Sequence, residues 1–248
     1  GKNLKIASGV EVIELKIETL GNKIVLNPTL VWDNKVSILI DTGIPGQLKQ
    51  IKESMAKVGV PFDTLKAIIL THQDIDHIGS VPQLLGELNN QITVYAHEND
   101  KPYIEGDLPL IKTDTSRMSK EELASLPREV KHLYNNPPKV KVNRLLEDKQ
   151  ELPYCGGIEV IYTPGHSPGH ISLYLKQTKT LVAGDAMVKI NNQLLGPVKQ
   201  TTLDIKTATE SLKKFLNYDI ETVICYHGGV FREDPRPHIS KILNEQFI

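Results

Sequence analysis

The sequence predicts an α+β fold in which β-sheets pack as a sandwich and helices cover them. Strand-like segments followed by a helical segment occur twice along the chain, before and after a polar middle region. Several loops that directly follow predicted strands are rich in Asp, His and Gly. Hydrophobic residues make up 40% of the 248 residues, which is enough for one sizeable core. We therefore expect a single domain over residues 1–248.

Apolar spacing predicts the elements of the first part of the chain. Residues 10–17 nearly alternate between apolar and polar side chains, which is typical of a half-buried strand. Two more strands are expected at Thr29–Trp32 and Lys35–Ile40, joined by an Asp-Asn turn. Helical spacing predicts a helix over residues 48–58, ended by a Gly and a Pro. The elements expected next are a strand at Lys66–Leu70, a helix at Pro82–Leu88 and a strand at Ile92–Ala96.

Residues 99–150 differ from the rest of the chain. They are polar and contain several prolines, and they have too few apolar residues for a domain of their own. One helix is expected at Ser119–Tyr134, because Ser119 and Glu122 have capping-box spacing. We interpret this region as a lid-like helical insertion.

Strands and helices alternate again after the insertion. Short apolar runs predict strands at Ile158–Tyr162, Ile171–Leu175, Thr180–Ala183 and Thr222–Cys225. Asp204 is expected to cap a helix whose apolar face includes Ala208 and Phe215. A last short helix is expected at His238–Leu243.

Charge and composition argue against several classes of function. Lys and Arg total 29 and Asp and Glu total 30, which gives a net charge of −1 and disfavours nucleic-acid binding through bulk charge. No apolar run reaches the roughly 18 residues that a membrane span needs. Cys155 and Cys225 stand far apart, so no disulfide framework is expected. Because residues 1–10 contain no signal-peptide core, we expect a cytoplasmic protein.

The segment at residues 71–79, with the sequence THQDIDHIG, concentrates metal-ligating side chains directly after a predicted strand. In an extended chain, residues two apart point to the same side, so His72, Asp74 and Asp76 can face one metal. His77 would point away unless the chain turns into a helix there, and the glycine that ends the segment provides this turn.

Three later loops offer further ligands, each directly after a predicted strand. His166 stands in the sequence Gly-His-Ser-Pro-Gly-His, Asp185 follows Ala-Gly, and His227 precedes Gly-Gly. The neighbouring glycines let the backbone come close to a bound group. A single His after a strand is more often structural, but this ordered series indicates one composite metal site.

These motifs resemble those of the metallo-β-lactamase superfamily. The family's first motif is His-x-His-x-Asp-His, and this chain has His-x-Asp-x-Asp-His over residues 72–77, with the later motifs in the family's order. The resemblance extends from residue 41 to residue 227 and is closest to poorly characterised bacterial hydrolases of this fold. It implies a four-layer αββα sandwich with two metal ions at one sheet edge.

The resemblance also implies a role for each residue. Metal one would be held by His72, Asp74, His166 and Asp185, and metal two by Asp76, His77, Asp185 and His227. A hydroxide bridging the ions would be the nucleophile, with Asp76 and Asp185 as catalytic residues; paired ions roughly 3.5–4 Å apart support such chemistry. Asp41 would fix a ligand imidazole, and His170 would support the ligands or face the substrate.

Asp74 departs from the family's pattern, which has His at this position. The departure adds a third carboxylate and lowers the formal charge of a loaded two-metal site by one unit. We expect zinc, with manganese or iron as alternatives, because a carboxylate is a harder ligand than an imidazole. A carboxylate at this position, there a Glu, also occurs in iron-binding, oxygen-reducing relatives.

We expect a metal-dependent hydrolase that cleaves a small ester, lactone, thioester or phosphoester. The alternatives are an iron-dependent oxidoreductase of the same fold, similar to sulfur dioxygenases, and a non-catalytic metal or ligand sensor. The complete ligand set argues against the sensor. Within the hydrolases, Val188 stands where lactonase relatives carry a Tyr, and the short stretch after His227 argues against a glyoxalase II-like enzyme.

The substrate is expected to be a small molecule, and no nucleic-acid or membrane partner is expected. Specificity should depend on the insertion at residues 99–150 and on the loop at residues 187–200. A homodimer formed through apolar residues of the insertion is the assembly that we consider.

Overall fold

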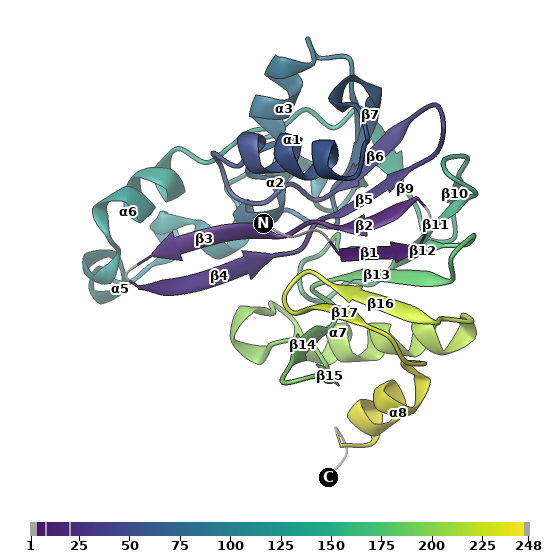
Figure 1. Cartoon of the computed structure of the whole chain (residues 1–248). Helices are drawn as coiled ribbons and strands as arrows, with labels where there is room; N and C mark the ends of the chain where they lie inside the picture. The colour runs from purple at the N-terminus through teal and green to yellow at the C-terminus, as the bar shows by residue number, and fades with distance from the viewer. Residues whose placement is uncertain (1–3, 8, 20, 246–248) are drawn as a thin grey trace.

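In the computed structural model, which describes residues 4–7, 9–19 and 21–245, two large sheets lie between helices (Figure 1). Helices α1 (Leu48–Lys57) and α3 (Val81–Glu87) lie on the outer side of one sheet. Helices α7 (Ile205–Ser211) and α8 (Arg236–Glu245) lie on the outer side of the other. This arrangement is the αββα sandwich that the sequence predicts.

The first sheet combines antiparallel and parallel pairing. In spatial order its strands are β1 (Leu4–Ala7), β2 (Val10–Val12), β5 (Thr29–Trp32), β6 (Ser37–Ile40), β7 (Leu65–Ile69), β8 (Thr93–His97) and β9 (Arg144–Leu146). Pairing is antiparallel from β1 to β6 and parallel from β6 to β9. Because parallel strands end at the same edge, Asp41 after β6 meets the 71–79 segment after β7.

The second sheet brings its own loops to this edge. In spatial order its strands are β10 (Glu151–Leu152), β11 (Ile158–Tyr162), β12 (Ile171–Leu175), β13 (Thr180–Gly184), β16 (Thr222–Cys225) and β17 (Gly229–Phe231). Strands β13 and β16 pair in parallel, with Gly184 opposite Cys225. Asp185 and His227, which follow these two strands, therefore lie at the same end of the sheet.

Shorter elements complete the frame. They are the helices α2 (Ile75–Ile78), α4 (Lys101–Ile104), α5 (Lys120–Ser125) and α6 (Arg128–Asn135), the hairpins β3 (Leu15–Thr19)–β4 (Asn22–Leu26) and β14 (Val188–Ile190)–β15 (Gln193–Leu195), and 3₁₀ turns at residues 62–64, 111–113, 115–117, 199–201 and 212–217.

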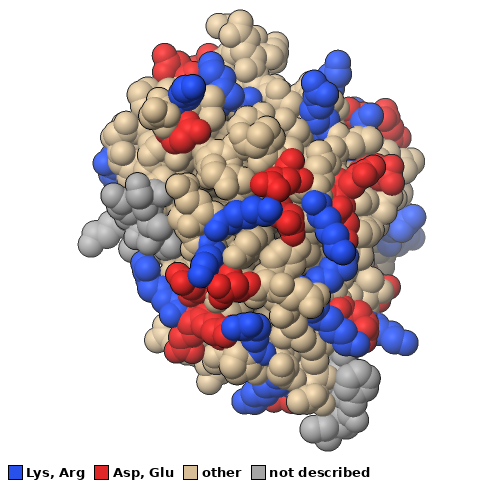
Figure 2. Space-filling model, turned by 90° about the vertical axis from the view of Figure 1, so that its right-hand side faces the viewer, with Lys and Arg blue, Asp and Glu red and all other residues tan. Residues whose placement is uncertain are grey.

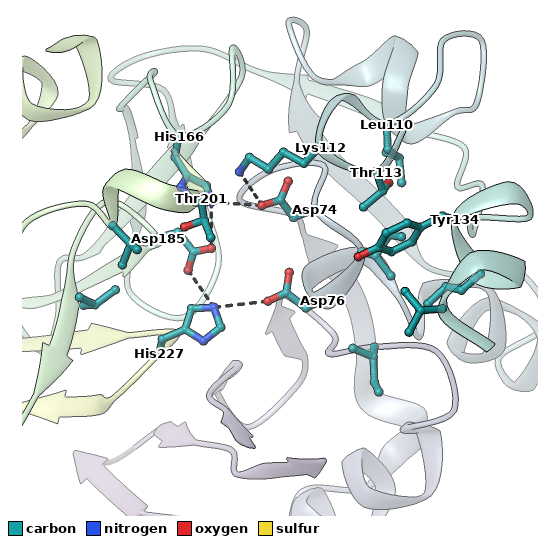
Figure 3. Close-up of a pocket in the computed structure, with 16 residues that line it drawn as sticks. Asp74, Asp76, Leu110, Lys112, Thr113, Tyr134, His166, Asp185, Thr201 and His227 are labelled. Carbon is teal, nitrogen blue, oxygen red and sulfur yellow. Dashed lines mark hydrogen bonds and ion pairs between the residues drawn. The ribbon is translucent and has the colours of Figure 1, made fainter. Parts of the chain in front are cut away.

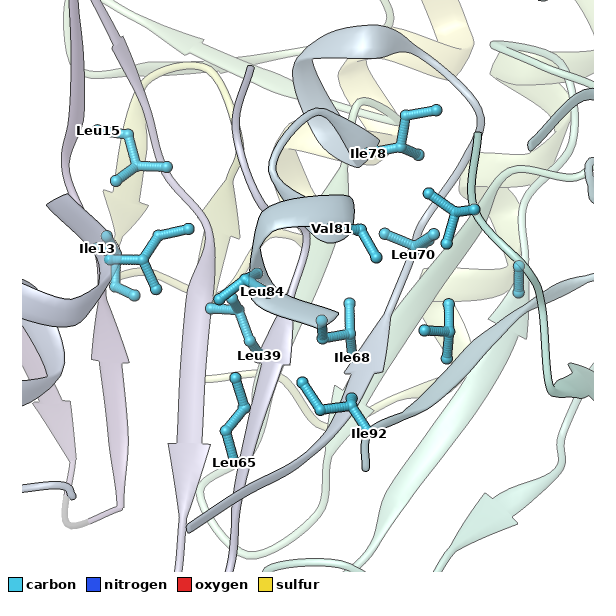
Figure 4. Packing of buried hydrophobic residues seen from close by; sticks show 14 of the residues in the cluster. Ile13, Leu15, Leu39, Leu65, Ile68, Leu70, Ile78, Val81, Leu84 and Ile92 are labelled. Atoms are coloured by element: carbon cyan, nitrogen blue, oxygen red, sulfur yellow. The ribbon is translucent and has the colours of Figure 1, made fainter. Parts of the chain in front are cut away.

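A cluster of apolar side chains fills the space between each sheet and its helices, and another fills the space between the two sheets. Alternate residues of the central strands face opposite ways, so Leu39 and Ile68 pack under α1 and α3, while Ile38 and Ile69 face the second sheet. Figure 4 shows the helix-side cluster, in which Leu39 and Ile68 lie close to Leu84. A third cluster, which includes Phe215, fills the space between the second sheet and its helices.

The structure differs from the sequence-based expectations at two main places. The strand expected at residues 10–17 is two strands, β2 and β3, which belong to different sheets. The helix expected at Ser119–Tyr134 is broken into α5 and α6, because Pro127 keeps Leu126 in an extended conformation with ψ 130°.

Four strands and two helix caps agree with the sequence-based expectations. Strands β5, β11, β12 and β16 have the predicted bounds. The Ser119 hydroxyl accepts a hydrogen bond from the Glu122 N–H at 3.0 Å, and Asp204 accepts one from the Thr207 N–H at 3.0 Å. Within the described residues, no helix is long and apolar enough to cross a membrane. The cytoplasmic location and the division into one domain with an insertion stay predictions.

Candidate metal centre

The local fold of the 71–79 segment directs its side chains inward. Strand β7 ends at Ile69, and helix α2 begins at Ile75 after an irregular segment that bends at Thr71 and Gln73. The His77 carbonyl accepts hydrogen bonds from the Thr42 N–H and hydroxyl, both at 2.8 Å. A Cβ at Gly79 would lie 2.3 Å from the backbone carbon of Ile44, so only glycine permits this close approach. The helical turn therefore swings His77 to the same side as Asp76, as the sequence argument required.

One group of potential ligands consists of His72, Asp74, His166 and Asp185, whose ligand atoms all lie within 4.8 Å of one another. Oδ2 of Asp74 lies 3.1 Å from Nε2 of His72 and 3.1 Å from Nε2 of His166. Oδ2 of Asp185 lies 3.1 Å from Nε2 of His166 and 3.4 Å from Nε2 of His72. The lone pairs of two imidazoles and two carboxylates thus converge on one point.

A second group, Asp76, His77 and His227, adjoins the first. Nε2 of His227 lies 3.3 Å from Oδ2 of Asp76, and Nε2 of His77 lies 3.7 Å from Oδ1 of Asp76. Asp185 reaches this group as well, because its Oδ2 is 3.0 Å from Nε2 of His77 and its Oδ1 is 3.6 Å from Nε2 of His227. Figure 3 shows Asp185 between His166 and His227, where it can serve both groups.

The donor set fits divalent metal ions. Nε2 of His72 and Oδ1 of Asp185 are buried, and beyond the ion-pair contacts given above neither makes a hydrogen bond within the described part of the chain. An unpaired buried acceptor is costly, and a cation at the convergence point would satisfy both atoms. Imidazole nitrogens and carboxylate oxygens are ligands that zinc, manganese and iron accept.

The charges in the site are strongly coupled. Burial by itself lowers the pKa of His77, but the negative charges of Asp185, Asp76 and Asp41 outweigh it and hold that pKa well above its ordinary value. Burial by itself raises the pKa of Asp185, but His77 and His166 outweigh it and hold that pKa well below its ordinary value. The site therefore favours a proton on His77 and negative charge on Asp185, which means that the surroundings attract positive charge.

Asp41 supports the second group from behind. Its Oδ1 accepts the Thr71 N–H at 2.9 Å, and its Oδ2 accepts the Thr71 hydroxyl at 2.7 Å. The same Oδ2 lies 2.8 Å from Nδ1 of His77. This contact orients the His77 ring so that Nε2 faces the convergence point, which is the arrangement the sequence analysis expected for Asp41.

His170 lies behind Asp185 and is fully buried. Its Nε2 accepts the backbone N–H of Asp185 at 3.0 Å, and its Nδ1 lies 2.9 Å from the Thr163 hydroxyl. Burial and the neighbouring His72 hold the pKa of His170 well below its ordinary value, so the ring is a neutral acceptor. Of the alternatives left open for His170, the structure favours support of a ligand-bearing loop over contact with a substrate.

Sequence reasoning missed the buried residue Asp100. Its two oxygens accept hydrogen bonds from the Gln73 N–H at 2.9 Å, the Gln73 side-chain amide at 3.1 Å, the Ser167 hydroxyl at 2.7 Å and the Gly169 N–H at 2.7 Å. Asp100 therefore ties the loop of His72 to the loop of His166. No motif marks it, because its partners lie far away in the sequence.

Tyr226 and Lys112 were missed as well. The Tyr226 ring stacks on His77 with 3.8 Å between ring centres, and its hydroxyl donates to the Asp76 carbonyl and accepts the Gly43 N–H. The Lys112 ammonium donates to Oδ2 of Asp74 at 2.7 Å. Outside the centre, His97 stacks on Tyr162 and His238 pairs with Glu233. His132 is exposed on α6 and belongs to neither ligand group.

A cavity of about 470 Å³ opens over the two groups. Asp74, Asp76, His166, Asp185 and His227 line its floor. Its walls are largely apolar and are formed by Ile44, Ile75, Leu110, Val130, Leu133, Tyr134, Val188 and Val198. In Figure 3 the side chains of Leu110, Thr113 and Tyr134, which belong to the predicted insertion, face the ligand residues from one side.

The αββα sandwich and the paired His/Asp groups at one edge of it are the features of the metallo-β-lactamase fold. The comparison with known families agrees with this assignment. The chain belongs to the Metallo-beta-lactamase superfamily, whose sequence profile matches residues 25–227.

Individual relatives point the same way. The probable metallo-hydrolase YflN of Bacillus subtilis is 34% identical over 206 residues, which cover 77% of this chain and 75% of that protein. The probable metallo-hydrolase YybB of the same organism is 28% identical over 205 residues, or 82% of this chain and 81% of that protein. The crystal structure of TTHA1429, a metallo-beta-lactamase family protein from Thermus thermophilus, superposes with a TM-score of 0.74 at 20% identity, covering 98% of this chain and 81% of that one.

Proposed function

We propose that this protein is a hydrolase that holds two divalent metal ions, with zinc as the expected metal, and cleaves a small ester, lactone, thioester or phosphoester. The observation that carries the proposal is the pair of adjoining ligand groups that share Asp185 on the floor of a cavity. The ligands proposed are His72, Asp74, Asp76, His77, His166, Asp185 and His227. The names of the relatives support hydrolysis as the reaction class.

The cavity supports a small-molecule substrate. A volume of about 470 Å³ lies in the range typical of small-ligand sites, and its apolar walls suit an acyl or other hydrocarbon group. On the face shown in Figure 2, acidic and basic side chains are interspersed, so this face offers no basic surface for a nucleic acid.

The site residues divide the chemistry between them. Bound ions would supply Lewis acidity toward a carbonyl or phosphoryl oxygen and would activate a water molecule. Asp76 is half-buried, and its Oδ2 lies 3.3 Å from Nε2 of His227, so this carboxylate can orient the attacking water and accept its proton. Asp185 lies between the two groups and can hold them at a fixed separation, while the apolar walls exclude bulk water.

A second candidate, an iron-dependent oxidoreductase, is favoured by one residue. Asp74 gives the first group two carboxylates and two imidazoles, a harder ligand set than one with three imidazoles. This candidate predicts oxygen consumption by the iron-loaded protein and little hydrolysis with any metal. A non-catalytic sensor predicts neither.

The test combines a substrate panel with metal analysis. Purified protein is loaded with zinc, manganese or iron(II), its metal content is measured, and chromogenic esters, lactones, thioesters and phosphoesters are assayed beside oxygen uptake. Hydrolysis that is lost in His72→Ala and retained in His132→Ala, a histidine outside the site, would support the proposal. If the fully loaded protein hydrolyses no class on the panel, or if His72→Ala retains activity, the proposal is wrong.

A further inference from the structure

Lys112 contacts the oxygen of Asp74 that faces the ligand group. Oδ2 of Asp74 lies 2.7 Å from Nζ of Lys112 and 3.1 Å from the Nε2 atoms of both His72 and His166. The ammonium and the metal position thus share one carboxylate oxygen. Figure 3 shows the Lys112 side chain extended toward Asp74 across the cavity.

The segment that carries Lys112 is anchored on the same motif. The backbone N–H of Ile111 donates to the side-chain oxygen of Gln73 at 2.9 Å, and the neighbouring Leu110 is buried. Residues 111–113 form a short 3₁₀ turn, which fixes the direction in which the lysine leaves the backbone. Two consecutive residues of the turn therefore bind two consecutive residues of the metal motif, which argues against a chance surface contact.

The charge and burial of Lys112 mean that its contact with Asp74 should affect the binding of a cation. Three carboxylates, Asp74, Asp76 and Asp185, belong to the two adjoining ligand groups. Lys112 is the only Lys or Arg among the described residues that line the cavity. The side chains of Lys112 and Asp74 are only 18% and 14% exposed, so solvent screens their interaction much less than that of a surface pair. A divalent cation in the first group would lie within a few ångströms of the ammonium and would be repelled by it.

We propose that Lys112 is a positioning residue that compensates the charge of Asp74 and competes with the metal for its Oδ2 oxygen. The inference rests on the proposed function only in that divalent ions must occupy the first group. Lys112 then has two opposite effects. It stabilises the metal-free protein by neutralising one of three clustered carboxylates, and it weakens the binding of a divalent ion at the first group.

These opposite signs distinguish the inference from a purely structural role. Lys112→Met keeps the length and the apolar stem of the side chain but removes its charge. We expect the melting temperature of the metal-free variant to fall by a few degrees, because the carboxylates lose their counter-charge. We expect its affinity for Zn²⁺ to rise by about tenfold, because the repulsion between two cations in a partly buried site is removed. Lys112→Arg, which keeps the charge, should stay close to the wild type in both measurements.

The affinity is measured by competition with a chromophoric chelator, and the number of bound ions by elemental analysis of the full-length protein. Lys176→Met is the matched control, since it removes a 2.9 Å lysine–carboxylate pair with Glu151 outside the cavity. This control should leave zinc affinity unchanged. Unchanged or weaker zinc binding by a folded Lys112→Met variant would overturn the inference while leaving the metal site itself intact. If wild type and His72→Ala bind zinc equally, both the inference and the proposed function are wrong.

Discussion

At the scale of single residues, Asp185 is the residue that connects the two ligand groups. Among the described residues it is the one carboxylate with contacts to both ligand groups, through His77 and His166 at 3.0 and 3.1 Å and through the longer contacts to His72 and His227. Its backbone is held from behind by His170. Loss of this side chain should therefore disconnect the two groups while the apolar layers stay intact.

We expect Asp185→Ala to lower metal affinity and metal-dependent hydrolysis by about 100-fold or more, with a loss of only about 1–3 kcal/mol in the free energy of unfolding. Elemental analysis, turnover and thermal melting of the same preparation measure the three effects. Asp234→Ala, which removes a carboxylate paired with Arg236 outside the site, is the matched control. Near-normal turnover of Asp185→Ala would contradict the role assigned to it.

The raised pKa of His77 predicts how the metal-free protein responds to pH. A group whose pKa is raised on folding contributes stability that is fully present below its unfolded pKa, about 6.5 for His, and is lost as the pH rises through the folded value. We therefore expect the melting temperature of the metal-free protein to fall as the pH rises above neutrality. Metal binding needs the deprotonated imidazole, so zinc affinity should rise over the same range. Melting curves and chelator competition in a pH series check both; two flat profiles would contradict the electrostatic account.

Sequence reasoning identified the candidate ligands but not the residues that contact them. The seven candidate ligands stand in compact motifs after strands, which a single sequence displays directly. Lys112, Asp100 and Tyr226 meet the site only because the fold brings distant segments together; the hydroxyl of Tyr226, for example, reaches the carbonyl of a residue 150 positions away. The charge count made from the sequence was incomplete for this reason, because it included Asp74 without Lys112.

At the scale of elements, Asp100 connects two ligand-bearing loops. It follows strand β8 and accepts four hydrogen bonds from residues 73, 167 and 169. All of these donors are buried with it, so no solvent can replace the carboxylate. The position of His72 relative to His166 depends on this junction.

We expect Asp100→Ala to lower the free energy of unfolding by about 3 kcal/mol, because it leaves several buried donors without acceptors. The melting temperature should fall by roughly 10 °C, and zinc affinity should fall because the two loops lose their common anchor. Ser167→Ala removes a single one of these bonds and should cost about 1 kcal/mol. Equal stability of the two variants would show that Asp100 does not act as a junction.

The elements that the sequence predicts correctly share one property. Strands β5, β11, β12 and β16 are short apolar runs between turn residues, so burial and local pattern agree. Strand β4 could not be found in this way, because four of its five residues are exposed and it forms through its pairing with β3. The split of residues 10–17 is equally non-local, since Val10 pairs with Val31 whereas Leu15 pairs with Leu26. The helix break is marked in the sequence by Pro127, but the capping box at Ser119 and Glu122 predicts only where a helix begins.

At the scale of the whole molecule, the metal site depends on both sheets. The 72–77 ligands extend from the first sheet, and His166, Asp185 and His227 extend from the second. Metal ions bound in the two groups would stabilise the docked sandwich, because their sites would be much weaker in the unfolded chain.

We expect removal of metal by a chelator to lower the melting temperature by roughly 10 °C, as follows from about 3–4 kcal/mol of stabilisation at a metal concentration well above Kd. Circular dichroism at 25 °C should stay nearly unchanged, because three apolar clusters hold the four layers together without metal. Asp185→Ala should show no such difference between chelator and zinc. A metal-free protein that is already unfolded at 25 °C would contradict this expectation.

The position of the ligands on both sheets also has a kinetic consequence. Residues 72 and 227 are far apart in the sequence and extend from different sheets, so we expect the site to form after the folding nucleus. Metal should therefore leave the refolding rate constant almost unchanged. Nearly all of the free energy by which metal stabilises the folded protein should appear as a lower unfolding rate constant. Stopped-flow refolding and unfolding in denaturant, with zinc and with chelator, would measure the two rate constants separately. In a cell, the lifetime of the native state would then depend on metal supply, while the time needed to reach it would not.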